Sequence, residues 1–251
     1  MYSFLIIDNK MRKIEKDYLE ALGYYLIEVP SSQKVYQEIS SHTDIFVSKI
    51  KDYIIVEPSF YDCFINQLKK YNLYSFYRNN IIEADYYVQE KYPLDIAYNI
   101  CTTGNYAIHN FKYTSKTILQ ILNKEKIQLI DVKQGYTNCS IAVIDDKSLI
   151  TTDKGIYNKI SKYNLDVLFV DNNLDIKLLK KDKYSDKKGF IGGCISRIDN
   201  KIIVTGDLNK IDTDKKIRYF IENKGLEIIE FKDLDVIDHG GIMHFEQNVC
   251  T

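Results

Sequence analysis

The sequence predicts an α/β fold of five strand–strand–helix–strand units arranged around a pseudo-fivefold axis. The first observation is that apolar strand patterns and one helical pattern recur in the same order along the chain. The second is the spacing of the unit starts, which lie 43 to 54 residues apart, a period typical of closed repeat architectures. These starts are placed at Asp44, Asp95, Asn138, Gly192 and Gly240.

The third observation concerns the two ends of the chain. The fifth unit begins near the C-terminus and lacks a second strand, a helix and a third strand, and the N-terminus supplies these three elements. A fifth unit shared by both ends would close the ring without a free sheet edge. An ordinary α/β sandwich is the alternative. A continuous Rossmann sheet is disfavoured because helices follow only every second strand.

The N-terminal segment predicts a strand, a helix and a strand. Ser3–Asp8 is a short apolar run, and apolar residues recur at helical spacing between Met11 and Leu22. Gly23 suits the end of this helix, and Tyr25–Val29 returns as a strand.

The first complete unit begins with the expected strand His42–Val47, followed by its hairpin partner Tyr53–Val56. A helix is expected over about Ser59–Tyr71. The third strand is either Leu73–Tyr77 or Asn80–Ala84, and the sequence leaves both open.

The later units repeat this order, and the fifth starts at His239–His244. Their expected elements are, for the second unit, strands Asp95–Ile100 and Tyr106–Ile108, helix Thr114–Lys124 and strand Gln128–Val132; for the third, a strand after Cys139, strand Ser148–Asp153, helix Ile156–Tyr163 and strand Asp166–Val170; for the fourth, strands Gly192–Arg197 and Lys201–Thr205, helix Thr213–Lys224 and strand Glu227–Phe231.

Composition limits the function classes. The 251 residues include 34 basic and 35 acidic ones, a net charge of −1, so no nucleic-acid partner is expected. The apolar runs are far shorter than a bilayer span, so no membrane partner is expected either. Five cysteines without paired spacing fit a reducing compartment, and no signal-peptide pattern is seen, which favours a cytoplasmic location.

Few prolines and no flexible linker predict one domain over residues 1–251, with Lys180–Lys188 as a solvated loop.

Two short motifs carry the candidate chemistry. Gln134–Asp145 places Cys139 where a Gly-led turn becomes an apolar strand, so its thiol would face the space outside the sheet. His42 and Asp44 are at positions i and i+2 of an expected strand, which directs both side chains to one face. A Cys thiolate is a strong nucleophile when a nearby imidazolium or bound cation lowers its pKa.

These motifs resemble those of the pentein superfamily, the guanidino-group-modifying enzymes, whose fold is five ββαβ units around a channel. His42-Thr-Asp44 looks like the family's His-x-Asp segment, and Gly135-Tyr-Thr-Asn-Cys139 looks like its nucleophile loop, most closely that of the dimethylarginine hydrolases. The resemblance implies that Cys139 attacks the central carbon of a small guanidine-like substrate. It also implies that His42 is the acid/base, that Asp44 grips the substrate, and that no cofactor is needed.

The chain departs from the family at other positions. The segment that matches the family's Glu-Gly-Gly-Asp reads His239-Gly-Gly-Ile242, with Asp238 one residue earlier, so Asp238 and His239 become the candidate substrate contacts. Asp95 repeats the position of Asp44 in the next unit and is a further candidate. The order of the units is permuted relative to the family.

The register within the third unit raises a separate question. Simple matching puts Asn138, and not Cys139, on the face of Asp44, so Cys139 requires a bulge or a loop position.

Three functions follow as alternatives. The first is a Cys-dependent hydrolase or amidinotransferase acting on a guanidine or amidine. The second is a non-catalytic binding protein on the same fold, as in the ribosome-binding initiation-factor branch, with Cys139 as an ordinary buried thiol. The third is a metal hydrolase that uses His42, Asp44 and His239 as ligands, with His244 as a further candidate.

Overall fold

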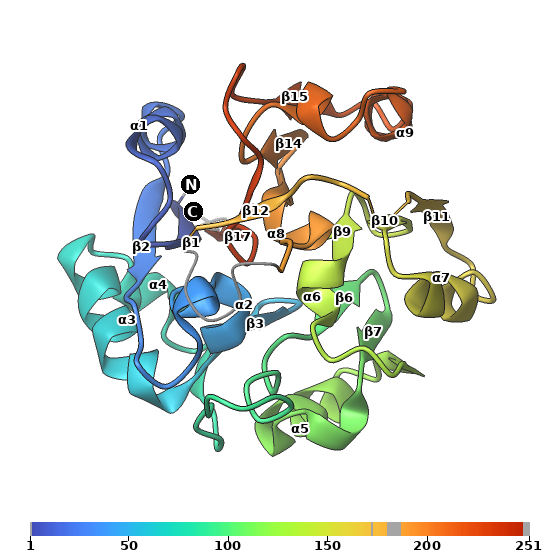
Figure 1. Ribbon diagram of the computed structural model, residues 1–251. Coiled ribbons are helices and arrows are strands. Elements are labelled where there is room, and N and C mark those ends of the chain that lie inside the picture. The colour runs from blue at the N-terminus through green and yellow to red at the C-terminus, as the bar shows by residue number, and fades with distance from the viewer. Residues whose placement is uncertain (1, 172, 180–186, 248–251) are drawn as a thin grey trace.

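Small separate sheets, connected by peripheral helices, make up the chain in the computed structural model (Figure 1), which describes residues 2–171, 173–179 and 187–247. Within these residues there are five three-stranded sheets and the two-stranded sheet β12–β16, and no closed barrel. Most of the lysine-rich run, residues 180–186, lies outside the described residues. No helix of the described residues is long and apolar enough to cross a membrane.

The strands have the following bounds: β1 Tyr2–Asp8, β2 Tyr25–Val29, β3 Val47–Ile50, β4 Tyr53–Val56, β5 Ile81–Glu83, β6 Cys101–Thr103, β7 Tyr106–His109, β8 Gln128–Asp131, β9 Ile141–Val143, β10 Ser148–Thr151, β11 Asp166–Phe169, β12 Lys177–Leu178, β13 Ile195–Ile198, β14 Lys201–Val204, β15 Glu227–Ile229, β16 Ile237–Asp238 and β17 Met243–Gln247. The α-helices are α1 Lys13–Ala21, α2 Thr43–Phe46, α3 Pro58–Lys70, α4 Tyr74–Tyr77, α5 Lys116–Lys124, α6 Thr137–Ser140, α7 Lys154–Ile160, α8 Ile191–Cys194 and α9 Lys216–Glu222. Short 3₁₀ turns cover Gln37–Ile39, Phe111–Tyr113 and Leu208–Lys210.

The five three-stranded sheets share one pairing pattern. In each, a middle strand is antiparallel to one neighbour and parallel to the other, as β4 is to β3 and β5. A helix crosses over between the two parallel strands, as such connections require. The sheet β17–β1–β2 joins the two ends of the chain, with Phe4 opposite Phe245. The fold is therefore mixed α/β, with the N- and C-terminal strands in one sheet.

Helix α3 shows how the sequence specifies these elements. Pro58 occupies its first turn, where the missing N–H costs nothing, and the Glu57 carboxylate accepts a hydrogen bond from the backbone N–H of Ser59 (2.7 Å). Phe60, Phe64 and Leu68 follow at intervals of four residues and are all buried. The helix therefore presents one apolar stripe to its sheet.

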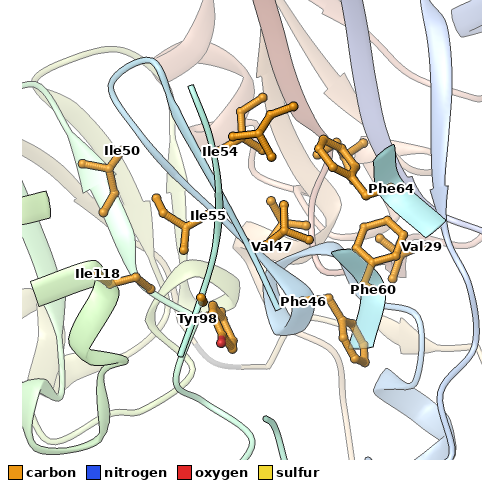
Figure 2. Close-up of a cluster of buried hydrophobic side chains, with 14 of the residues drawn as sticks. Val29, Phe46, Val47, Ile50, Ile54, Ile55, Phe60, Phe64, Tyr98 and Ile118 are labelled. Carbon is orange, nitrogen blue, oxygen red and sulfur yellow. The ribbon is translucent and has the colours of Figure 1, made fainter. Parts of the chain in front are cut away.

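The largest apolar core lies around the sheet β3–β4–β5. Figure 2 shows Phe60 and Phe64 of α3 on one side of this sheet and Tyr98 and Ile118 of the next unit on the other. The sheet is thus covered on both faces, one by its own helix and one by its neighbour in sequence.

Several expected strands are wrong at their N-terminal ends. His42–Val47, Gly192–Arg197 and the segment around Cys139 begin as the helical turns α2, α8 and α6, and β3, β13 and β9 start only afterwards. Asp95–Ile100 is a turn region before β6, and His239–His244 is mostly non-strand before β17.

Hydrogen bonds of two threonines account for two of these helical turns. The Thr43 hydroxyl donates towards the carbonyls of Gly240 (2.6 Å) and Gly241 (2.9 Å), and the Thr137 hydroxyl donates towards those of Asn99 (2.7 Å) and Ile108 (2.9 Å). These long-range bonds outweigh the local strand pattern. Between the two open positions for the third strand, β5 lies within Asn80–Ala84, and α4 occupies Tyr74–Tyr77.

The packing of α3 predicts a large loss of stability for Phe64→Ala. Because Phe64 is fully buried, its truncation leaves a cavity and should lower the free energy of unfolding by about 3–5 kcal/mol. The matched control is Ile14→Ala on α1, where the side chain is 56% exposed and the change should be within about 0.5 kcal/mol. Urea unfolding measures both, and similar losses for the two variants would contradict this description of the core.

Candidate functional site

Three short helical turns, α2, α6 and α8, lie near the centre of the molecule, whereas α1, α3, α5, α7 and α9 lie at its periphery (Figure 1). Each central turn directly precedes a strand, β3, β9 or β13. Asp44 lies on α2 and Cys139 on α6, so a helical turn provides the non-strand position that Cys139 requires.

Cys139 is 3% exposed, and polar groups from two other segments surround its thiol. Its Sγ donates a hydrogen bond to Asp44 Oδ2 (2.7 Å) and accepts one from Asn99 Nδ2 (3.3 Å). Asn99 Oδ1 in turn accepts from the backbone N–H groups of Asn138 (2.9 Å) and Cys139 (3.3 Å). Asn99 thus fixes both the thiol and the backbone of its turn. It lies in a segment that reads as a strand, and no motif marks it.

His42 and Asp238 complete the cluster around Cys139. One ring nitrogen of His42, Cys139 Sγ and one carboxylate oxygen of Asp238 all lie within 4.8 Å of one another, and all three residues are buried. His42 Nδ1 lies 3.8 Å from Asp238 Oδ1. The Asp238 carboxylate accepts hydrogen bonds from the backbone N–H groups of Phe190 (2.8 Å) and Gly240 (2.9 Å). The structure therefore brings together four of the predicted site residues: His42, Asp44, Cys139 and Asp238.

Glycines allow the segments of this cluster to approach closely. A Cβ atom at Gly240, whose φ is +71°, would lie 2.5 Å from His42 Cβ and 2.7 Å from Asp44 Oδ1. A Cβ atom at Gly193 would lie 1.8 Å from Asp238 Oδ1. Any larger residue at either position would push the carboxylates away from Cys139.

His239 lies beside Asp8 and Glu15 and does not belong to the cluster of His42, Cys139 and Asp238. Its Nδ1 is 3.9 Å from Asp8 Oδ2, and its Nε2 is 3.8 Å from Glu15 Oε2. Asp8 Oδ2 is also 4.0 Å from His42 Nε2. Asp8 and Glu15 were not among the predicted site residues. Asp8 is an acid at the end of the first apolar strand, and this position is a signal in the sequence that could have marked it as a candidate site residue.

Asp95 lies outside the cluster of His42, Cys139 and Asp238. It is buried, and its carboxylate accepts a hydrogen bond from the Tyr136 hydroxyl. Although Asp95 repeats the position of Asp44 in the next unit, its surroundings therefore differ from those of Asp44.

The predicted metal-ligand set is not gathered in one place. His244 contacts Ser3 Oγ (2.8 Å) and Asp199 (3.4 Å), and neither belongs to the cluster around Cys139. Of the part of the chain that the structure describes, the groups able to hold a metal ion are His42, Cys139 and Asp238, and separately Asp199, His244 and Glu246.

Burial dominates the electrostatics of the cluster. Burial raises the pKa of Cys139 well above its usual range, and the negative charges of Asp44 and Asp238 raise it further. Burial also raises the pKa of Asp44 to about 6, although the charge of His42 and the Cys139 thiol act in the opposite direction. The unliganded thiol is therefore protonated at neutral pH. A cation held between the two carboxylates would lower the pKa of Cys139.

A cavity of about 600 Å³ lies beside Asn138. Asn138, Gly192 and Gly241 belong to its lining, and Asn138 Nδ2 also donates a hydrogen bond to Asp44 Oδ2 (3.2 Å). The cavity lining includes neither Cys139 nor His42. Asn138 therefore contacts both the cavity and Asp44.

Solved structures with a similar fold are members of the pentein superfamily. A Pseudomonas aeruginosa dimethylarginine dimethylaminohydrolase, a Cys-to-Ser mutant in complex with citrulline, aligns at a TM-score of 0.59 and 12% identity over 98% of this chain and 100% of its own. The agmatine deiminase of C. jejuni aligns at 0.52 and 11%, over 97% and 93%. A saxitoxin-pathway amidinotransferase from Microseira wollei aligns at 0.52 and 11%, over 89% and 74%. The predicted resemblance to penteins is confirmed at the level of the fold.

A family model places the chain more narrowly. Residues 6–243 match the model described as a family of unknown function (DUF6873), and the chain belongs to that family. A search of the curated proteins finds no match.

The pKa of Asp44 predicts a pH-dependent effect of Asp44→Asn on stability. Because the folded-state pKa of about 6 lies above the unfolded value of 3.8, the folded protein binds this proton more tightly, and the resulting stabilisation is lost as pH rises from about 4 through 6. The variant should therefore gain on the order of 2 kcal/mol relative to wild type between pH 4.5 and pH 7, measured by urea unfolding.

The pKa of Asp8 is shifted in the opposite direction to that of Asp44, so Asp8→Asn serves as the comparison. Burial by itself raises the pKa of Asp8, but the neighbouring imidazoles of His239 and His42 lower it to about 2. Its stabilisation is present above pH 4 and lost only as pH falls toward 2. The effect of this substitution should therefore be nearly equal at pH 4.5 and pH 7. If Asp44→Asn also changed the free energy of unfolding equally at pH 4.5 and pH 7, this would contradict the raised pKa of Asp44.

Proposed function

We propose that this protein is a Cys-dependent enzyme that acts on a small cationic guanidine or amidine through a covalent adduct on Cys139. The observation that supports this most directly is the cluster of a thiol, an imidazole and two carboxylates, drawn from separate segments into one buried site. The similar solved structures are named as a dimethylarginine dimethylaminohydrolase, an agmatine deiminase and an amidinotransferase, which is consistent with such a substrate.

We propose in addition that the five three-stranded sheets are the blades of a five-bladed α/β-propeller forming one domain. Their common pairing pattern and the shared sheet of the two chain ends support this arrangement. So does the peripheral position of the five crossover helices in Figure 1. The cluster around Cys139 would then lie on the axis.

The proposed reaction begins with binding of the cation between Asp44 and Asp238. The substrate charge offsets the two carboxylates that raise the pKa of Cys139, so the thiol loses its proton to His42. The sulfur attacks the central amidine carbon and forms a tetrahedral adduct. The carbon–nitrogen bond then breaks as His42 returns the proton to the departing amine, which leaves an amidino group on Cys139.

The adduct is resolved by a second nucleophile. His42 removes a proton from water, the oxygen attacks the adduct carbon, and the carbon–sulfur bond breaks to regenerate Cys139. This completes a hydrolysis. With an amine in place of water, the same steps transfer the amidino group.

A non-catalytic binding protein is the second candidate, and one observation favours it. His42, Asp44, Cys139 and Asp238 are all buried, and the 600 Å³ cavity includes none of them in its lining. This function predicts that Cys139 does not react and that a panel of guanidines releases no ammonia or amine. A third candidate, a metal hydrolase, predicts stoichiometric metal in the purified protein and loss of stability on chelation.

Labelling with 2-chloroacetamidine tests the proposed nucleophile. The cationic probe should alkylate Cys139 in wild type, giving an adduct of one amidine per chain that peptide mass spectrometry locates. Cys139→Ala should abolish labelling, whereas Cys194→Ala should retain it, since Cys194 is equally buried but its thiol contacts only the Ile191 carbonyl (3.3 Å). Equal labelling of the two variants, or labelling of neither, would reject this function.

The two carboxylates predict a preference of the site for a cationic probe. We expect wild type to react faster with 2-chloroacetamidine than with the neutral, nearly isosteric 2-chloroacetamide. Asp44→Asn and Asp238→Asn should each reduce this rate ratio by roughly tenfold, the usual scale for loss of a charge-assisted hydrogen bond. Asp95→Asn removes a buried carboxylate outside the cluster and serves as the control. A ratio that is the same in all four proteins would rule out recognition of a cation by Asp44 and Asp238.

A further inference from the structure

Behind Cys139, buried carboxylates and imidazoles alternate in a continuous series. Its members, in order, are Asp238, His42, Asp8, His239 and Glu15, and each is at most 1% exposed. The four successive N···O separations are 3.8, 4.0, 3.9 and 3.8 Å. They come from β16, the residue before α2, β1, the residue after β16, and α1. Only the first two members belong to the cluster around Cys139.

Five polar atoms of this series have no hydrogen-bond partner. Both ring nitrogens of His42, both of His239 and Asp8 Oδ2 are buried without a partner. Separations of 3.8–4.0 Å exceed a hydrogen bond, but they are too short for an intervening water, which would need about 4.6 Å between its two partners. The imidazoles and carboxylates therefore face each other directly, and a small contraction would link them.

The two oxygens of Asp8 have different surroundings. Oδ1 accepts hydrogen bonds from the backbone N–H of Lys10 (2.7 Å) and from Ser41 Oγ (2.6 Å), which fixes the plane of the carboxylate. Oδ2 points between His42 and His239 and has no donor. Burial raises the pKa of Asp8, but the two neighbouring imidazoles lower it to about 2, so the carboxylate is ionised.

This asymmetry decides which nitrogen of His42 carries the proton. Its Nδ1 faces Asp238 Oδ1, which already accepts the backbone N–H of Gly240. Its Nε2 faces Asp8 Oδ2, which has no donor. The proton is therefore better placed on Nε2, leaving Nδ1 free as the base.

We propose that Asp8 and His239 are positioning residues for His42. Asp8 holds the Nε2–H tautomer of the ring, and His239, bridged between Asp8 and Glu15, fixes Asp8 in turn. This inference rests on the proposed function, in which His42 is the acid/base. Such carboxylate–imidazole pairing sets the tautomer and the orientation of a catalytic histidine.

Of the residues that the structure describes, the charged or titratable groups that face the two imidazoles are the following. His42 faces Asp8 of β1, Asp238 of β16, and Asp44 and Cys139 of the central turns. His239 faces Asp8 and Glu15, and the Glu15 carboxylate is paired with Arg12.

Nitrogen-15 NMR of the full-length, histidine-labelled protein tests the proposal without any substrate. The chain has four histidines, so each imidazole can be assigned by substitution. In wild type at neutral pH, we expect His42 to carry its proton on Nε2. Observation of the Nδ1–H tautomer in wild type would overturn the proposal, whatever the variants show.

Two substitutions of the positioning residues sharpen the test. Asp8→Asn can keep Oδ1 on Lys10 and Ser41 while its amide N–H₂ replaces Oδ2, so it presents a donor to His42 and should invert the tautomer to Nδ1–H. His239→Asn retains a donor near the position of Nδ1 and should preserve the wild-type signature, whereas His239→Leu should lose it. Asp95→Asn should leave His42 unchanged. An unchanged His42 signature in both Asp8→Asn and His239→Leu would overturn the proposal.

The labelling rate connects this geometry to reactivity. Asp8→Asn and His239→Leu should slow alkylation of Cys139 by 2-chloroacetamidine by roughly tenfold or more, and His239→Asn should restore most of the rate. Failure of the proposed function would give a different result. Cys139 would not react in wild type, while His42 would still carry its proton on Nε2. An unaltered rate in a variant with an inverted tautomer would overturn the positioning role.

Discussion

The burial of two carboxylates beside a thiol is the constraint on which the rest of this site depends. Asp44 and Asp238 both raise the pKa of Cys139, and burial removes the water that would otherwise screen them. A buried anionic pair is costly unless it is paired or hydrogen-bonded. Backbone N–H groups stabilise Asp238, whereas Asp44 receives only the Asn138 amide and the Cys139 thiol. The site is thus electrostatically incomplete, and a cationic ligand is the group that would complete it.

The same constraint accounts for the backbone around the site. Carboxylates from different segments converge only if their backbones approach closely, and Gly193 and Gly240 allow this because no Cβ atom intervenes. The Thr43 hydroxyl links α2 to the carbonyls of Gly240 and Gly241, so the turn that carries Asp44 is anchored to the segment that follows Asp238. Cys139 lies on a helical turn and not on a strand, and its thiol meets Asp44 and Asn99. Gly193, Gly240 and Thr43 therefore position the charged side chains of the site and make no direct contribution to its chemistry.

Sequence reasoning succeeded where local pattern and tertiary structure agree. Tyr25–Val29 and Tyr53–Val56 are β2 and β4 with the predicted bounds, because apolar runs next to turn residues leave few other options. It failed at His42–Val47 and Asp95–Ile100, where long-range hydrogen bonds determine a turn within an apolar segment. The motifs predicted His42, Asp44, Cys139 and Asp238, and the structure places these four residues in one cluster. Asn99 was missed because its contacts with Cys139 depend on the juxtaposition of two units, which no local spacing encodes.

His239 shows how a departure from a familiar motif can be chemically coherent. Viewed in the sequence alone, a histidine where related enzymes carry an acid removes a carboxylate from the site. In the structure, the adjacent Asp238 lies beside His42 and Cys139, and Asp8 from β1 provides a second acid on the other side of the His42 ring. The imidazole at position 239 lies between the carboxylates of Asp8 and Glu15, 3.9 and 3.8 Å from them. A side chain without a polar group at this position would remove the group that separates two buried acids, which is unfavourable.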